Sequence, residues 1–180
     1  IPYIYKQGFK GSVICTNATR DLCALMLVDS GFIHEHDIKW FNKKRVAHNL
    51  PPVEPIYTKK DAQDCMQCFI GVGYDRKFNI DENISVLFTN SGHMLGSAVI
   101  TVSIKENGKI TNIAYTGDIG RPTNRILKSP KPFPQADVLL TESTYGDRLH
   151  EVNNESEDAL LDVITDTCVR KGGKLIIPSF

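Results

Sequence analysis

A run of short strand patterns between Lys77 and Tyr115 most constrains how this chain can fold. Apolar residues alternate with polar ones at Ile84, Val86 and Phe88, which is the period of a half-buried strand. Further on, Asn107-Gly108 separates two apolar segments, and this dipeptide favours a two-residue β-hairpin turn. The expected strands cover residues 77–80, 84–89, 98–104 and 110–115. The pattern therefore predicts a meander of neighbouring strands.

The residues on either side of this run predict helices and further strands. Thr16 or Asn17 can cap a helix that we expect to end at Gly31, and Thr58, three residues before Asp61, resembles a capping box. The other expected elements are a short helix at 1–7, a strand at 12–15, helical segments at 38–49 and 59–70, a strand at 138–141, a helix at 155–170 and a buried final strand at 174–180. Elements in this order indicate an α/β or α+β fold with helices layered on a sheet.

Composition narrows the class of protein. With 180 residues and 41% hydrophobic content, the chain is long enough for one sizeable core, and no apolar run is long enough to cross a membrane. The 21 basic and 21 acidic residues cancel, so a polyanion would have to bind a local patch. Five cysteines, an odd number, favour a reducing cytoplasmic location over a secreted disulfide scaffold. Because no methionine starts the chain and a strand pattern runs to its end, we expect residues 1–180 to be part of one domain, truncated at both ends.

Three polar residues suited to metal binding or acid catalysis follow predicted strands. His93 lies between Gly92 and Gly96, Asp118 follows Gly117, and Glu142 follows the strand at 138–141. Glycines allow close backbone approach, and loops at strand ends carry chemistry. Each residue alone could be an ordinary surface histidine or turn carboxylate. Together they indicate a metal site with an acid beside it.

Two other groups of potential ligands are interpreted as ordinary helix residues. Cys65 and Cys68 have the C-x-x-C spacing, but one pair supplies two ligands where a structural zinc ion needs four. The pair also falls inside a predicted helix, unlike a thioredoxin-type site. The segment His34-Glu35-His36-Asp37 lies in a charged helical region away from the strand ends. We expect it to face solvent.

Four motifs occur in order along the chain. They are S-G-H-M-L-G-S-A around His93, Y-T-G-D-I-G-R around Asp118, T-E-S-T-Y-G-D-R around Glu142, and the closing G-G-K-L-I-I-P-S-F. In this order they resemble the β-CASP branch of the metallo-β-lactamase superfamily, whose members are RNA-processing nucleases. Residues 1–22 also resemble the helix and strand that follow the family's H-x-H-x-D-H loop. The resemblance covers nearly the whole chain and implies a partial metallo-β-lactamase αββα sandwich.

The resemblance implies roles for individual residues. His93 is expected to bind one of two Zn²⁺ ions, and Asp118 to bridge both and so to take part in catalysis. Glu142 is expected to be catalytic by orienting the histidine that protonates the leaving oxygen. A carboxylate can span two cations, which lower the pKa of the water that attacks phosphorus. Four residues of the same motifs are expected to contact the substrate: Ser91, Arg121, Ser143 and Tyr145.

One departure from the family pattern limits the expected function. The chain has no H-x-H-x-D-H motif, and His34-Glu35-His36-Asp37 has a different spacing. The chain therefore holds an incomplete ligand set. We expect it to be part of a longer zinc-dependent ribonuclease and to be inactive alone. The sequence leaves open whether that ribonuclease cleaves as an endonuclease or an exonuclease. The alternatives are a small-molecule metallo-hydrolase of the same superfamily and a non-catalytic RNA-binding or assembly subunit. T-E-S-T-Y-G-D-R favours the nucleic-acid branch, and the presence of His93, Asp118 and Glu142 favours an active protein.

Two clusters of positive charge bear on the expected partner, which is single-stranded RNA. Between Ile119 and Ala136 there is no acidic residue, and the basic ones are Arg121, Arg125, Lys128 and Lys131. This strip suits phosphate contacts, and a solvated loop is an equally good interpretation. The second cluster, on a predicted helix, is expected to face solvent and comprises Lys39, Lys43, Lys44 and Arg45. The sequence predicts no membrane association and allows a homo-oligomer.

Overall fold

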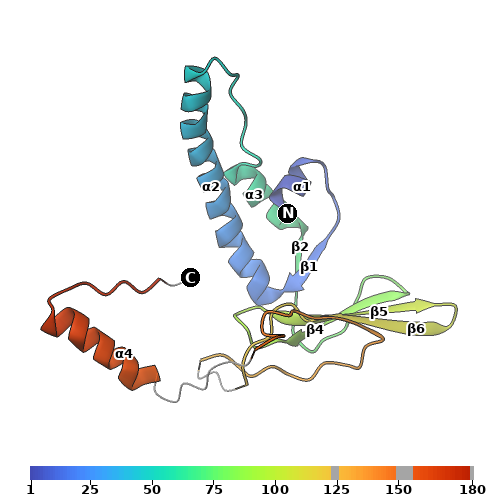
Figure 1. Ribbon diagram of the computed structural model, residues 1–180. Helices are drawn as coiled ribbons and strands as arrows, with labels where there is room; N and C mark the ends of the chain where they lie inside the picture. Colours follow the sequence, from blue (N-terminus) through green and yellow to red (C-terminus); the bar gives the residue numbers. More distant parts are fainter. Residues whose placement is uncertain (123–125, 149–155, 179–180) are drawn as a thin grey trace. The chain divides into compact units, whose positions relative to one another are not determined.

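The computed structural model describes residues 1–122, 126–148 and 156–178. The chain forms two compact units, Ile1–Glu142 and Ser143–Phe180 (Figure 1). The first unit contains two sheets and most of the helical residues, and the second contains one helical segment. In the part of the chain that the structure describes, no helix combines the length and the apolar character that crossing a membrane requires.

The longest helix is α2 (Asn17–Ala47). It begins where the Thr16 side chain accepts a hydrogen bond from the Thr19 amide at 3.2 Å, so Thr16 is the cap of the two candidates, Thr16 and Asn17. The predicted stop at Gly31 is wrong, because α2 continues through it and includes residues 38–47 of the segment expected at 38–49. Gly31 is buried, and a Cβ added there would lie 2.8 Å from Lys59 Cα. Glycine at this position allows a second backbone segment to approach the helix.

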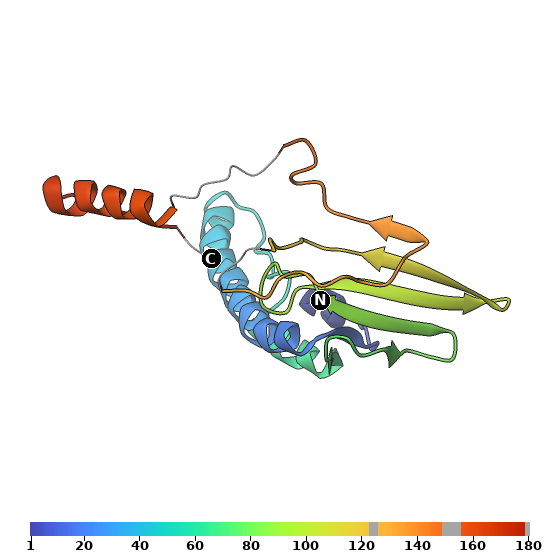
Figure 2. The same cartoon turned by 90° about the horizontal axis from the view of Figure 1, so that it is seen from below.

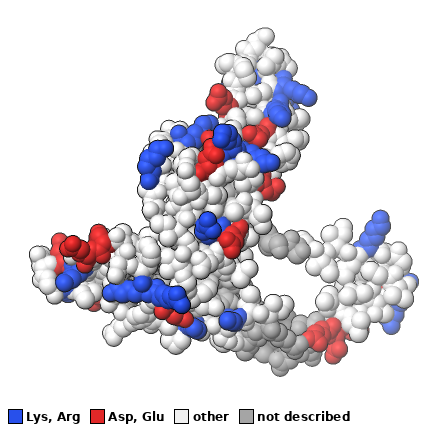
Figure 3. All heavy atoms as spheres, turned by 180° about the vertical axis from the view of Figure 1, so that it is seen from behind, with Lys and Arg blue, Asp and Glu red and all other residues white. Residues whose placement is uncertain are grey.

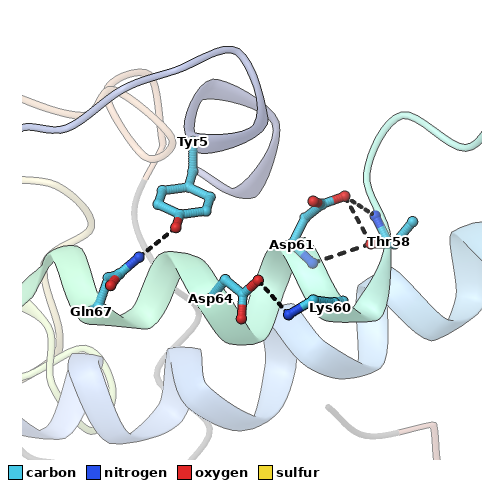
Figure 4. Close-up of polar contacts among 6 residues, drawn as sticks. All are labelled: Tyr5, Thr58, Lys60, Asp61, Asp64 and Gln67. Carbon is cyan, nitrogen blue, oxygen red and sulfur yellow. Dashed lines mark hydrogen bonds and ion pairs between the residues drawn. The ribbon is translucent and has the colours of Figure 1, made fainter.

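That second segment starts α3 (Lys59–Cys65), which packs against α2. Its first turn is the predicted capping box (Figure 4). The Asp61 amide donates to Thr58 Oγ1 at 3.1 Å, and the Thr58 amide donates to Asp61 Oδ2 at 2.8 Å. Each residue thus satisfies a backbone group of the other, and the prediction is confirmed.

The segment after α3 is a strand, so the predicted helix at 59–70 is too long. A 3₁₀ turn (Met66–Cys68) is followed by β2 (Phe69–Val72), which pairs in parallel with β1 (Val13–Thr16). Pairing with a strand distant in sequence decided this structure, because it satisfies the backbone of β2 and buries Phe69 and Val72. A small core contains buried Cys15, Cys65 and Phe69, with Tyr5 of α1 (Pro2–Lys6) packed against it.

The larger sheet contains β3 (Phe78–Asn79), β4 (Ile84–Asn90), β5 (Ala98–Glu106), β6 (Lys109–Tyr115) and β7 (Val138–Leu140), adjacent in sequence order (Figure 2). All neighbours are antiparallel except β6 and β7, which are parallel. The predicted meander is confirmed. Asn107 and Gly108 have φ values of 50° and 77°, as a type I′ hairpin turn requires.

A second core joins the two sheets. Val72 of β2 packs with Val86 and Phe88 of β4, and Ile14 and Ile100 pack against them. Together with the helices, the parallel and mixed sheets confirm a mixed α/β class.

In the second unit, α4 (Ser156–Ile164) continues as a π-helical segment (Thr165–Arg170), which agrees with the helix expected at 155–170 in its described residues. The strand expected at 174–180 is wrong where the structure describes it. Residues 174–178 have no regular structure, and Ile176 is 85% exposed. An apolar run becomes a strand only when a partner strand satisfies its backbone, and the described residues of this unit supply none. Residues 179–180 lie outside the described residues.

Candidate active site

Three strands of the larger sheet end at the same edge. Both β4 and β6 are antiparallel to β5, and β7 is parallel to β6, so β4, β6 and β7 all run in one direction. His93 follows β4, Asp118 follows β6 and Glu142 follows β7. The topology therefore brings the three predicted loops to one edge.

The loop that carries His93 is anchored to the start of α2. The Gly96 carbonyl accepts hydrogen bonds from the hydroxyls of Thr16 at 2.8 Å and Thr19 at 3.1 Å. Gly96 has a φ of 92°, and a Cβ there would lie 2.8 Å from the Thr19 amide nitrogen. Glycine is thus needed both for the backbone conformation and for the close contact. Thr19 is a supporting residue that the sequence analysis missed, because its partner lies 77 positions away.

The loop that carries Asp118 packs directly against the His93 loop. A Cβ added to Gly120 would lie 1.8 Å from the Gly92 carbonyl oxygen, so only glycine fits there. The Gly120 amide donates to the Ser91 carbonyl at 2.8 Å, and Ser91 Oγ donates to the Asp118 carbonyl at 3.0 Å. Because Ser91 is 1% exposed, it serves in this structure as a buried link between the two loops.

These contacts place the two predicted metal ligands side by side. His93 Nε2 lies 3.5 Å from Asp118 Oδ2. The His93 side chain is 41% exposed and that of Asp118 is 65% exposed, so both can be reached from solvent. The imidazole and the carboxylate form an ion pair when His93 is protonated, and either can donate electron pairs to a cation.

Glu142 holds the backbone beside Asp118. Its Oε1 accepts a hydrogen bond from the Ile119 amide at 2.7 Å. Thr116, which is 1% exposed, links the same segments. Its hydroxyl donates to the Gly117 carbonyl at 2.7 Å and lies 3.4 Å from the Glu142 amide, which donates to it. Thr116 was also missed from the sequence, although its place before Gly117-Asp118 in the motif was a usable signal.

The other expected substrate residues lie elsewhere on the chain. Arg121 is exposed, three residues after Asp118. Ser143 and Tyr145 belong to the second unit, where the Arg148 guanidinium lies 5.3 Å from the centre of the Tyr145 ring.

The basic strip after Asp118 is less available than its sequence suggests. Lys131 Nζ pairs with Asp75 Oδ2 at 2.6 Å, and the Lys131 amide donates to the Asn90 carbonyl at 2.9 Å. Lys128 remains exposed and borders a cavity of about 290 Å³ beside Gly92 and Met94. Arg125 lies outside the described residues. The charge of Lys131 is thus already neutralised within the fold.

The two groups first interpreted as ordinary helix residues, Cys65 with Cys68 and residues 34–37, lie in helical elements: α3 with the 3₁₀ turn after it, and α2. Cys65 ends α3 and is buried, and its Sγ donates to the Ala62 carbonyl at 3.1 Å. Burial raises the pKa of the Cys65 thiol. His36 and Asp37 are exposed on α2, as expected, with 3.8 Å between His36 Nδ1 and Asp37 Oδ1. His34 and Glu35 are half-buried, so the expectation holds for only part of this segment, and the His34 ring packs edge-on against Tyr57 with 4.8 Å between the ring centres.

The donor set at the sheet edge fits part of a zinc site. Imidazole nitrogen and carboxylate oxygen are both accepted zinc ligands, and His93 and Asp118 present one of each at adjacent positions. Within residues 1–122, 126–148 and 156–178 no three histidine, cysteine or acidic side chains are grouped as a complete site would require.

Comparison with known proteins finds two kinds of relatives whose similarity extends over the whole of this chain. No family model matches the chain. It is 36% identical over 183 residues to the transcription termination factor FttA of Methanocaldococcus jannaschii, and equally similar to the FttA of Methanococcus maripaludis. It is 27% identical over 180 residues to Ribonuclease TTHA0252 of Thermus thermophilus. These matches cover 100% of this chain, but only 26% of each termination factor and 36% of the ribonuclease.

Fold, site and homology together indicate the class of protein to which this chain is similar. The fold and the edge loops define a mixed α/β protein in which a histidine and a carboxylate lie side by side at the end of the main sheet, with Glu142 bound to the backbone of the Asp118 loop. The homology, which runs along the whole of this chain, then supports the resemblance of the motifs to the β-CASP branch of the metallo-β-lactamase superfamily: the chain is homologous to 26% of each termination factor and 36% of the ribonuclease.

Proposed function

We propose that this chain forms part of a zinc-dependent ribonuclease that hydrolyses RNA phosphodiester bonds. The observation that carries the proposal is the approach of His93 Nε2 to Asp118 Oδ2 at 3.5 Å, at an exposed sheet edge. The similarity to a ribonuclease and to transcription termination factors supports RNA, in particular a transcript, as the substrate. The proposal includes a metallo-β-lactamase αββα sandwich formed with chain segments beyond these 180 residues, as one domain.

In this proposal each residue at the edge has a distinct part. His93 and Asp118 would hold metal through the imidazole Nε2 and the carboxylate. Bound zinc would act as a Lewis acid and lower the pKa of its bound water to near neutrality. Glu142 fixes the Asp118 loop through the Ile119 amide, and Thr116 fixes the loop and Glu142 together. Removing a supporting contact of this kind typically lowers metal affinity or activity by about 10- to 100-fold. Arg121, Ser143 and Tyr145 remain proposed substrate contacts, and Ser91, which is buried, would act on the site by linking the His93 and Asp118 loops.

The decisive experiment uses the longer protein that contains this chain. Zinc content and cleavage of an end-labelled single-stranded RNA are measured for the unaltered protein and for Asp118→Ala. We expect the substitution to abolish cleavage with no loss of folding, because the loop backbone, not the carboxylate, makes the packing contacts. Asp29→Ala, an exposed carboxylate on α2, is the matched control and should cleave normally. Retained cleavage by Asp118→Ala would remove this residue from the site.

The same preparation separates the rival functions. A small-molecule metallo-hydrolase would hydrolyse a thioester substrate and leave RNA intact. A non-catalytic subunit would bind RNA with neither zinc nor cleavage. Products from RNA blocked at both ends would distinguish internal cleavage from cleavage at an end.

A further inference from the structure

The outer half of α2 presents two aromatic rings to solvent. Trp40 is 59% exposed and Phe41 is 45% exposed. Both line a groove of about 550 Å³ between α2 and the returning chain at Pro55 and Ile56. Large aromatic side chains normally contribute to a core, so this exposed pair requires another explanation.

The groove has a fixed wall. Asn42 Nδ2 donates to the Val53 carbonyl at 2.8 Å, and the Val53 amide donates to Asn42 Oδ1 at 2.9 Å. Arg45 Nε donates to the Pro51 carbonyl at 2.7 Å. These three bonds hold the returning segment against α2, so the aromatic surface is preformed.

Positive charge surrounds both rings. Lys43 and Lys44 follow Trp40 by three and four positions, and Lys44 and Arg45 follow Phe41 in the same way, so each ring has two cationic neighbours on the helix surface. Lys44 Nζ lies 3.6 Å from the centre of the Trp40 ring, and the Arg45 guanidinium lies 5.7 Å from that of Phe41.

This charge is not neutralised by acidic side chains. Between Ile38 and Val53 the sequence contains no acidic residue, and the basic ones are Lys39, Lys43, Lys44 and Arg45. In the described part of the chain none of the four forms an ion pair, whereas Lys60 and Lys131 pair with carboxylates at 2.8 Å and 2.6 Å. Asp37 borders the groove and lies beside His36. Figure 3 shows Lys and Arg side chains at the upper end of α2.

We propose that this surface, Trp40 and Phe41 with Lys43 and Lys44, binds single-stranded RNA. Unpaired bases stack on exposed aromatic rings while lysines contact the phosphates. Paired bases cannot stack in this way, which is why the surface suits a single strand. The choice of RNA as the polyanion rests on the proposed function. At 1.5 Å per residue, Trp40 lies about 35 Å along α2 from the Thr16 end that anchors the His93 loop. The surface would therefore hold RNA several nucleotides away from the cleaved bond.

The single tryptophan of the chain makes a direct test. The 180-residue chain, with EDTA present to exclude cleavage, is titrated with a single-stranded oligonucleotide while tryptophan fluorescence is followed. We expect saturable quenching by the single strand and little by a duplex of equal length. A Trp40 signal unchanged while the oligonucleotide binds would overturn the proposal, since the RNA would then occupy another surface.

Variants measured by anisotropy of a labelled oligonucleotide locate the binding. Lys43→Glu with Lys44→Glu should weaken binding at least about tenfold and flatten its salt dependence. Phe41→Ala should weaken it about tenfold. The matched control, Lys105→Glu with Lys109→Glu on β5 and β6, should bind normally, and equal weakening by both pairs would contradict the proposal.

Two further outcomes are informative. Quenching by polyglutamate as strong as that by RNA would mark a docking face for an acidic protein and would refute RNA binding here. Binding at Trp40 without cleavage by the longer protein would instead refute the nuclease and leave this surface standing.

Discussion

At the residue scale, two buried threonines have opposite surroundings. Thr116 is 1% exposed and its hydroxyl joins Gly117, Thr141 and Glu142 through hydrogen bonds. Thr101 is 3% exposed, and in the described part of the chain its Oγ1 is buried without a partner. A buried hydroxyl stabilises a fold only when it is hydrogen-bonded.

Replacing each threonine by valine, which has nearly the same shape, separates these cases. Thr116→Val should lower the free energy of unfolding by about 1–3 kcal/mol, because it leaves partners unsatisfied. Thr101→Val should leave it unchanged or raise it by about 1 kcal/mol, because an unpaired hydroxyl is removed from a central strand. Urea unfolding followed by circular dichroism measures both, and equal destabilisation would mean that Thr101 has a partner in solution.

At the element scale, Gly31 decides how α2 and α3 pack. Gly31→Ala gains about 1 kcal/mol of helix propensity but inserts a Cβ 2.8 Å from the Lys59 backbone. Overpacking of this kind costs about 1–3 kcal/mol, so we expect net destabilisation. The control is Asp29→Ala, two positions earlier on an exposed site. Chemical denaturation of the two variants compares the effects, and a more stable Gly31→Ala would show that α3 moves aside.

The capping box of α3 makes stability depend on pH. Partial burial disfavours the charge of Asp61, but the hydrogen bonds from Thr58 outweigh this, and the pKa of Asp61 lies below its ordinary value of 3.8. A lowered carboxyl pKa adds stability above pH 3.8, and this stability is lost as the pH falls through the folded-state pKa. Asp61→Asn should therefore show a smaller loss of stability than the unaltered chain between about pH 5 and pH 3.

The matched control for this pH dependence is on the same helix. Asp64→Asn removes the exposed pair with Lys60, which is worth little. In thermal unfolding measured across this pH range, Asp61→Asn should lose less stability on acidification than Asp64→Asn, which should behave like the unaltered chain. Parallel pH profiles for all three proteins would argue against a role for the cap.

At the scale of the whole molecule, the two units differ in how much they bury. The first unit has two connected cores, whereas α4 in the second leaves Leu160, Leu161 and Val163 between 48% and 60% exposed. A short helix without packing is marginal in water. We expect amides of α4 to exchange with deuterium at least about a thousandfold faster than those of β5. Comparable protection of the two elements in mass spectrometry would contradict this.

Sequence reasoning was most accurate where structure depends on neighbouring residues. It identified the Thr16 cap, the Thr58–Asp61 box and the Asn107-Gly108 hairpin, each of which is local chemistry. It failed at Gly31, at β2 and at the closing strand pattern, because each depends on a segment distant in sequence. At the site, the motifs supplied His93, Asp118 and Glu142, but the supporting Thr19 and Thr116 depend on distant hydrogen bonds.

The sequence by itself identified His93, Asp118 and Glu142 as candidate site residues and predicted that each follows a strand. Only the tertiary structure decided that they meet. The directions of β4, β6 and β7 bring the three loops to one edge, and the contact of Gly92 with Gly120 sets His93 beside Asp118. The tertiary structure also paired Lys131 with Asp75, whereas Lys43 and Lys44 form no ion pair in the described part of the chain. The physical reason is the same throughout: turns and caps are short-range interactions, whereas proximity and charge pairing depend on which distant segments pack together.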